Sequence, residues 1–231
     1  MLPITIDAAR VQIALVGNGE AARRRLALLD EAGARHVAVY AEAASPELVE
    51  AAGGRLRSRL PIAEEIAGVQ LVFLAAVGEP ALCRLRQIAN RAGVLLNVED
   101  DIAGSDFHSP AVVRRGDLTL AVSTGGKSPA LAALIRRRIE ASFGPEWRAR
   151  LERVAALRNR WRAAGLDGAA VARLTTIWLD RQAGSLAGGV ANFAFRPALP
   201  GGKVGRHKSD PAGGTSWRST TRSATVSPTS R

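Results

Sequence analysis

The sequence is poor in the residues that build covalent or metal frameworks. Its 231 residues include one cysteine, Cys83, which excludes an internal disulfide framework and a metal cluster held by several cysteines. The three histidines lie far apart in the chain and show no metal-ligand spacing. There is also no Gly-x-Ser-x-Gly nucleophile turn. We therefore expect no resident metal site and no serine or cysteine hydrolase.

Long apolar segments are also absent. The longest apolar run, 69–77, is interrupted by Gln70 and has the length of a strand, whereas a membrane-spanning helix needs about 20 residues. The first residues lack the basic region and the long apolar stretch of a signal peptide. Together with the single cysteine, these absences predict a cytoplasmic protein with no membrane partner.

The positive charge is unevenly distributed. The formal net charge is +11, of which residues 196–231 carry +6 and the preceding 195 residues carry +5. That last segment is rich in Gly, Pro, Ser and Thr and poor in aliphatic residues, so we expect it to be disordered. A tail that binds nucleic acid is the alternative, but we predict no nucleic-acid partner. The mildly basic body suits an anionic ligand.

The first hundred residues alternate between strand and helix patterns. Short apolar runs at 11–16, 37–40, 71–76 and 94–98 are typical of buried parallel strands. Helical patterns follow Gly19, begin at Pro46 after the N-cap Ser45, and occupy 79–91. This order predicts an α/β fold with a Rossmann-like parallel sheet over residues 1–109.

The pattern changes after Pro110. Two strand-like runs, 111–115 and 118–122, flank a hairpin turn at Gly116-Asp117, and a helix starts at Pro129 after the N-cap Ser128. From Glu146 onward the pattern is purely helical. We predict a small β/α segment over 110–144, a helical domain over 145–185 and a disordered basic tail over 186–231.

A dinucleotide-binding motif lies between the first strand and the first helix. Residues 17–22 read Gly-Asn-Gly-Glu-Ala-Ala and fit G-x-G-x-x-A, in which glycines allow a tight turn and helix amides face a pyrophosphate. Glu42 follows the second strand, where a carboxylate binds the ribose hydroxyls and repels a 2′-phosphate. The motif therefore predicts NAD rather than NADP. A glycine-rich turn without a nucleotide is the alternative.

Two further segments could carry chemistry. Residues 97–101, Asn-Val-Glu-Asp-Asp, follow a predicted strand, where ligands of open α/β sheets bind; one carboxylate could accept a proton. A solvated acidic loop is the alternative. Residues 123–129, Ser-Thr-Gly-Gly-Lys-Ser-Pro, form an anion nest suited to substrate carboxylates, or simply an N-capped helix. ATP binding is disfavoured because Ala121 replaces the first glycine of a P-loop and Pro129 removes a helix amide.

These motifs together resemble the amino-terminal module of siroheme synthase and its stand-alone relatives, the precorrin-2 dehydrogenases. The resemblance covers about residues 1–180. It is carried by segments in the family's order and spacing: Leu2-Pro3-Ile4, Val16-Gly17-Asn18-Gly19, Asn97-Val98-x-Asp100, Phe107 with Pro110, Arg114-Arg115-Gly116-Asp117-Leu118, and Ser123-Thr124-Gly125-Gly126-x-Ser128-Pro129-Ala130.

The resemblance implies an NAD-dependent enzyme that oxidises precorrin-2 to sirohydrochlorin. It also implies a homodimer formed through the β/α segment, and for some members ferrochelatase activity with Fe²⁺ as a substrate. Asp100 matches the aspartate implicated in both reactions. The cofactor contacts would be Gly17, Asn18, Gly19, Glu20, Ala21, Ala41, Glu42 and Asn97. The substrate contacts would be Ser123, Thr124, Gly125, Gly126, Lys127, Ser128 and Arg114.

The sequence departs from the family in two places. Residues 75–79 read Ala-Ala-Val-Gly-Glu where the family often has Thr and Asp or Asn, so a side-chain contact to the cofactor would be missing. The methyltransferase module of the fused enzyme has no counterpart among the roughly fifty residues after 180. A non-catalytic NAD-sensing module remains the alternative function.

Overall fold

The computed structural model describes residues 2–190, with side chains described through residue 182. These residues belong to one compact unit. Of the predicted tail, residues 191–231 lie outside the described residues, whereas 186–190 continue the last helix. No helix in the described part of the chain is long and apolar enough to cross a membrane.

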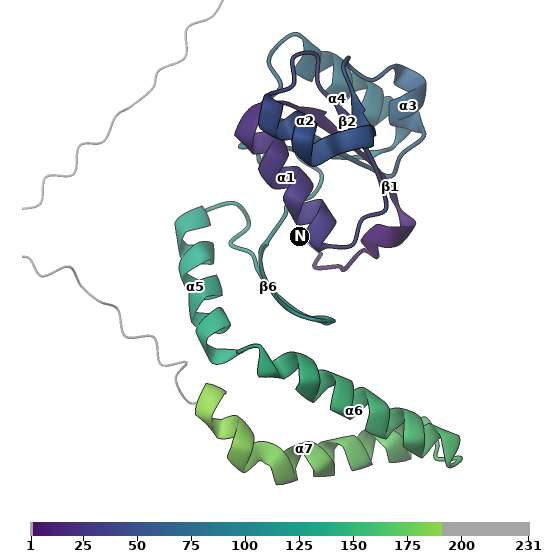
Figure 1. The fold of residues 1–231 in the computed structure, drawn as a ribbon, viewed down its shortest axis with the longest axis vertical. Coiled ribbons are helices and arrows are strands. Elements are labelled where there is room, and N and C mark those ends of the chain that lie inside the picture. Colours follow the sequence, from purple (N-terminus) through teal and green to yellow (C-terminus); the bar gives the residue numbers. More distant parts are fainter. Residues whose placement is uncertain (1, 191–231) are drawn as a thin grey trace, which may run out of the picture. The chain divides into compact units, whose positions relative to one another are not determined.

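A five-stranded parallel sheet forms the first half of the structure (Figure 1). The central strand β1 (Gln12–Gly17) pairs with β2 (His36–Tyr40) on one side and β4 (Leu71–Ala75) on the other. The short β3 (Leu56–Arg57) and β5 (Leu95–Val98) form the edges, giving the order β3-β2-β1-β4-β5. The strand order reverses beside β1, which is where such sheets bind dinucleotides.

Helices cover both faces of this sheet, and each face has its own apolar core. On one face, α1 (Gly19–Glu31) and α2 (Pro46–Ala52) bury Leu26 and Leu48 against the sheet. On the other, α3 (Ala63–Ala67) and α4 (Ala81–Ala92) bury Ile66 and Leu85. Burial on both faces explains why the strands read as continuous apolar runs.

The second half begins with an antiparallel hairpin of β6 (Ala111–Arg115) and β7 (Leu118–Val122). Helix α5 (Pro129–Ser142) packs on this hairpin, and its N-cap Ser128 accepts a hydrogen bond from the Leu131 amide at 3.2 Å. Helices α6 (Glu146–Ala163) and α7 (Gly168–Val190) follow and run side by side (Figure 1).

The predicted order of strands and helices is confirmed, with local differences. Helix α4 begins at Ala81 rather than Glu79, after Pro80. The short elements β3 and α3 are not predicted from the sequence, because neither has a strong apolar pattern. In α5 the apolar stripe is incompletely covered by the chain itself, because Leu131 is 41% exposed.

Candidate functional site

The glycine turn is shaped by a close approach between two strands. The end of β1 lies so near the end of β4 that a Cβ on Gly17 would fall 1.8 Å from the Ala75 carbonyl oxygen. Gly19 adopts φ +63°, with no heavy atom within 4 Å of a Cβ built on it. The first glycine therefore permits the strand contact, and the second leaves open space at the start of α1 for a ligand.

Asn18 joins this turn to the loop after β2. Its Oδ1 accepts hydrogen bonds from the amides of Gly19 (2.7 Å) and Ser45 (2.9 Å), and its Nδ2 donates to the Ala43 carbonyl. One side chain thus fixes the ends of β1 and β2 relative to each other. The Gly19 amide is occupied by this contact, so the next amides of α1 are the ones free to face an anion.

A cavity of about 390 Å³ lies at the carboxyl ends of β1, β2 and β4. We call it the glycine-turn cavity. Its lining includes the predicted cofactor residues Gly17, Asn18, Ala41 and Glu42, together with Ala76-Val77-Gly78 after β4. Glu42 is exposed, as a carboxylate that binds ribose hydroxyls requires. The cavity, the glycine turn and this carboxylate fit the binding of an adenosine dinucleotide such as NAD.

Three predicted cofactor residues stand at the start of α1 without lining this cavity: Gly19, Glu20 and Ala21. Glu20 forms an ion pair with Arg23 at 2.7 Å, and this hydrogen bond lowers the pKa of Glu20. Asn97 lies elsewhere: it is buried at the end of β5, and its Nδ2 donates to the Phe107 carbonyl at 2.8 Å.

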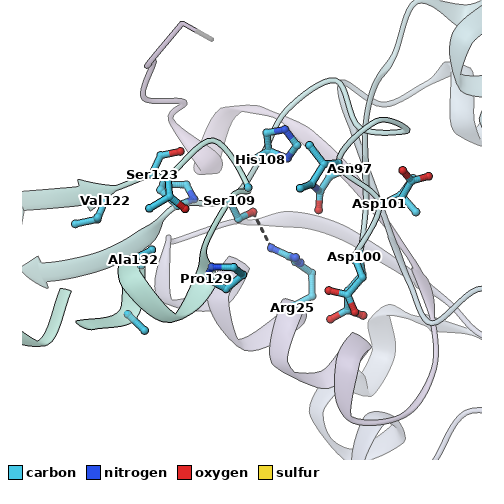
Figure 2. A pocket seen from close by; sticks show the side chains of 18 residues that line it. Arg25, Asn97, Asp100, Asp101, His108, Ser109, Val122, Ser123, Pro129 and Ala132 are labelled. Atoms are coloured by element: carbon cyan, nitrogen blue, oxygen red, sulfur yellow. Dashed lines mark hydrogen bonds between the residues drawn. The ribbon is translucent and has the colours of Figure 1, made fainter. Parts of the chain in front are cut away.

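A second cavity, of about 550 Å³, opens beyond β5, and we call it the acid cleft. Its walls come from the loop after β5, from helix α1 and from the segment joining β7 to α5 (Figure 2). The loop after β5 and the segment joining β7 to α5 pack closely together, since a Cβ on Gly126 would fall 2.4 Å from Ile102 Cδ1.

Of the three consecutive acids at 99–101, two are held by arginines. Asp101 Oδ2 accepts from Arg86 Nη2 at 2.7 Å, and Glu99 lies 3.6 Å from Arg24. Asp101 Oδ1 also accepts from the Gly104 amide at 2.8 Å, and this bond is the main reason that the pKa of Asp101 is lowered. Both residues therefore have structural partners.

Asp100 differs from its two neighbours. Among residues 2–182, its carboxylate forms no hydrogen bond or ion pair, and it faces the acid cleft (Figure 2). Its backbone adopts φ +61°, a left-handed conformation that non-glycine residues rarely adopt and that clusters at functional sites. The structure thus separates one free carboxylate from two that fasten the loop.

The predicted anion nest contributes only in part to the cleft wall. Ser123, Thr124, Gly126 and Pro129 line the cleft. The Thr124 hydroxyl donates to the Ser128 carbonyl (3.1 Å) and accepts from the Ser128 amide (3.2 Å), which fixes the turn before α5.

Four predicted substrate residues do not line the cleft: Gly125, Lys127, Ser128 and Arg114. The reason for Arg114 is strand alternation, which buries Val113 and leaves Arg114 exposed, with Nη1 3.4 Å from Thr119 Oγ1. Ser128 is engaged as the α5 N-cap.

Arg25 and Ser109 also line the cleft, although no sequence motif marks either of them. Arg25 lies within a run of three arginines, and periodicity alone did not single it out. His108 also lines the cleft. Among the described residues, no three His, Cys, Asp or Glu side chains converge as a set of metal ligands.

Two segments of the chain match known family models. Residues 4–111 match the family model described as putative NAD(P)-binding, and residues 115–142 match the model of the sirohaem biosynthesis protein central domain. The siroheme synthase of Stutzerimonas stutzeri is 42% identical over 130 residues, which cover 55% of this chain and 28% of that protein. That of Methylococcus capsulatus is 38% identical over 166 residues, 71% of this chain and 35% of its own.

The chain thus spans about a third of the length of these relatives. Among solved structures, SirC, a precorrin-2 dehydrogenase, matches with a TM-score of 0.63 over 79% of this chain and 91% of that chain, at 22% sequence identity. This likeness confirms the fold, and the sequence matches confirm the resemblance inferred from the motifs.

Proposed function

We propose that this chain, a homologue of the siroheme synthases, catalyses the NAD-dependent dehydrogenation of precorrin-2 to sirohydrochlorin. The observation that carries the proposal is the free carboxylate of Asp100 in a cleft at the carboxyl end of the parallel sheet. The glycine turn also lies at the carboxyl ends of the strands, so a cofactor site and an unpaired base occur at the same end of the sheet.

The chain's own residues would hold NAD along the glycine turn. The free amides at the start of α1 would face the pyrophosphate, and Glu42 would accept hydrogen bonds from the adenosine ribose. Ala75-Ala76-Val77 offers backbone and methyl groups rather than polar side chains to the rest of the cofactor. When bound, NAD supplies the hydride acceptor.

Dehydrogenation removes a hydride and a proton from the macrocycle, so the site needs a proton acceptor as well as the cofactor. Asp100 fits that role because its lone pairs are not occupied by an arginine or an amide. The loop around it is fastened by Asp101 and by Ser105, whose Oγ accepts from the Val98 amide at 2.8 Å. Such fastening would hold the base in position and so provide part of the rate enhancement.

The proposal includes a homodimer. The exposed Leu131 on α5 supports a homodimer formed through the 110–144 segment, since a second copy would cover the apolar stripe.

Iron insertion is a second candidate activity. It is favoured by the same carboxylate, which can accept the pyrrole protons that Fe²⁺ displaces. Fe²⁺ would then be a substrate rather than a resident cofactor.

An anaerobic assay with precorrin-2 and NAD tests the main proposal. We expect NADH formation at 340 nm together with the spectral change from precorrin-2 to sirohydrochlorin. NAD binding by calorimetry without any turnover would contradict the enzyme and favour an NAD-sensing module. Repeating the assay with Fe²⁺ or Co²⁺, and following the metallated product, tests the second activity separately.

A further inference from the structure

Arg25 is a cation without an acidic partner in the wall of the acid cleft. It extends from α1, and its Nη1 donates to Ser109 Oγ at 2.7 Å (Figure 2). Among residues 2–182 this is its one hydrogen bond, and it forms no ion pair. A guanidinium has five N–H donors in a rigid fork, so four of them have no partner in the described structure.

The position of this guanidinium is fixed before any ligand arrives. Its central carbon lies 5.1 Å from the centroid of the Phe73 ring, which in turn contacts Phe107 edge-on at 5.2 Å. Stacking on an aromatic ring restricts the long side chain, so less rotamer entropy is lost when it binds an anion. Burial is also substantial: it is the main cause that lowers the pKa of Arg25, and Glu99 opposes it.

The charges around the cleft explain why such a cation is needed. Glu99, Asp100 and Asp101 all line it, and they would repel a substrate that carries carboxylates. The two cations predicted for this task, Lys127 and Arg114, do not line the cleft. Among the described residues that line the acid cleft, Arg25 is the one arginine.

We propose that Arg25 is a specificity-determining residue that binds a peripheral carboxylate of the tetrapyrrole and so orients the macrocycle beside Asp100. This inference rests on the proposed function and adds to it the group that recognises the anion. A planar, bidentate pairing suits guanidinium and carboxylate, and the fork remaining beyond Ser109 provides it.

The test compares Arg25→Gln and Arg25→Lys with Arg35→Gln. The control removes the same charge from an exposed residue that precedes β2, at the amino-terminal end of the strands and outside the acid cleft. For Arg25→Gln we expect a KM for precorrin-2 raised at least tenfold. Sirohydrochlorin binding, followed by tryptophan fluorescence, should weaken by a similar factor. The Kd for NAD should stay within twofold, Arg25→Lys should recover part of the loss, and Arg35→Gln should match the wild type.

A merely structural role, in which Arg25 only fastens the Ser109 loop, is distinguished in two ways. Ser109→Ala removes that hydrogen bond but keeps the guanidinium, so it should affect KM less than threefold. The octamethyl ester of sirohydrochlorin should bind to the wild type more weakly than the acid, and Arg25→Gln should shrink that preference at least fivefold. An equal loss for acid and ester, or Ser109→Ala matching Arg25→Gln, would overturn the inference.

The inference and the proposed function fail in different ways. If the wild type neither oxidises precorrin-2 nor binds sirohydrochlorin, both the proposed function and the role of Arg25 are wrong. If the wild type is active and Arg25→Gln retains its KM and its affinity for sirohydrochlorin, only the role of Arg25 is wrong.

Discussion

Arg86 Nη2 lies 2.7 Å from Asp101 Oδ2, and this contact ties the loop after β5 to helix α4. The same loop leaves the adjacent Asp100 carboxylate unpaired in the acid cleft. Two consecutive aspartates therefore have different tasks, one in holding the loop and one in facing the ligand. Substitutions at the two positions should have separable effects.

Asp100→Asn should lower kcat for dehydrogenation by roughly 100-fold or more, because a positioned general base contributes about 10²–10⁴. Asparagine tolerates the left-handed backbone at φ +61°, so the melting temperature should change little. The Kd for NAD should stay within twofold. Steady-state kinetics, calorimetry and thermal unfolding give the three readouts, and an unchanged kcat would refute the role of Asp100.

The contrasting variant is Asp101→Asn. It replaces a charged acceptor that serves both Arg86 and the Gly104 amide. We expect a lower free energy of unfolding than in Asp100→Asn, because the loop loses a charged acceptor that two donors share. Urea denaturation of the two variants side by side would show the division of tasks, and equal destabilisation would contradict it.

Glu42→Ala should relax the preference for NAD over NADP. The variant removes the acceptor for the ribose hydroxyls and the charge that repels a 2′-phosphate, so NAD should bind about tenfold more weakly, for a loss of about 1.4 kcal/mol. NADP should bind more tightly than to the wild type. Glu47→Ala, which removes an exposed acid on α2 outside the glycine-turn cavity, should leave both affinities unchanged.

Gly17→Ala should destabilise the protein more than Gly33→Ala. Both positions have positive φ, but only at Gly17 would the new methyl meet backbone, 1.8 Å from the Ala75 carbonyl oxygen. We expect about 1–2 kcal/mol for Gly33→Ala from the left-handed backbone alone, and a clearly larger loss for Gly17→Ala because two central strands must separate. Denaturation curves in the presence and absence of NAD would measure both effects.

Acid should remove a small stabilisation provided by Glu65. Its Oε1 lies 2.7 Å from Arg59 Nη2, and this hydrogen bond together with one from the Ile62 amide lowers the pKa of Glu65 from 4.5 to about 2. A carboxyl with a lowered pKa in the folded state stabilises the protein above its unfolded pKa, and that contribution is lost as the pH falls toward 2.

The variant Glu65→Gln should therefore be less stable than the wild type above about pH 5, by roughly 1 kcal/mol or less for an ion pair at the surface. The difference in melting temperature should shrink steadily between pH 4.5 and pH 2. Thermal unfolding monitored by circular dichroism at several pH values would measure it. A difference that grows on acidification would show that the sign is wrong.

The sequence predicts well the features that depend on local pattern. Continuous apolar runs located β1, β2, β4 and β5, and the Ser-Pro pairs at 45–46 and 128–129 located the starts of α2 and α5. Gly17 and Asn18 of the glycine motif also line one cavity together with Glu42. These signals are short-range, so one sequence suffices to detect them.

What the sequence could not supply is which side chains face the cleft. Arg25 and Lys127 carry the same charge, yet only Arg25 lines the wall, because that depends on how α1 packs on Phe73 and on the path of the loop to Ser109. Likewise, the sequence does not distinguish Glu99, Asp100 and Asp101. In the structure, arginines from α1 and α4 form ion pairs with Glu99 and Asp101 and leave Asp100 unpaired. Such distinctions arise from long-range contacts.

The three hydrogen bonds of Asn18 have a mechanical consequence for ligand binding. Because this side chain joins the glycine turn to residues 43–45, the two subsites expected to hold the pyrophosphate and the ribose cannot shift independently. Occupation of one half should therefore stiffen the other. When a fragment such as AMP binds, the pyrophosphate and ribose subsites should already have the spacing that the whole dinucleotide requires.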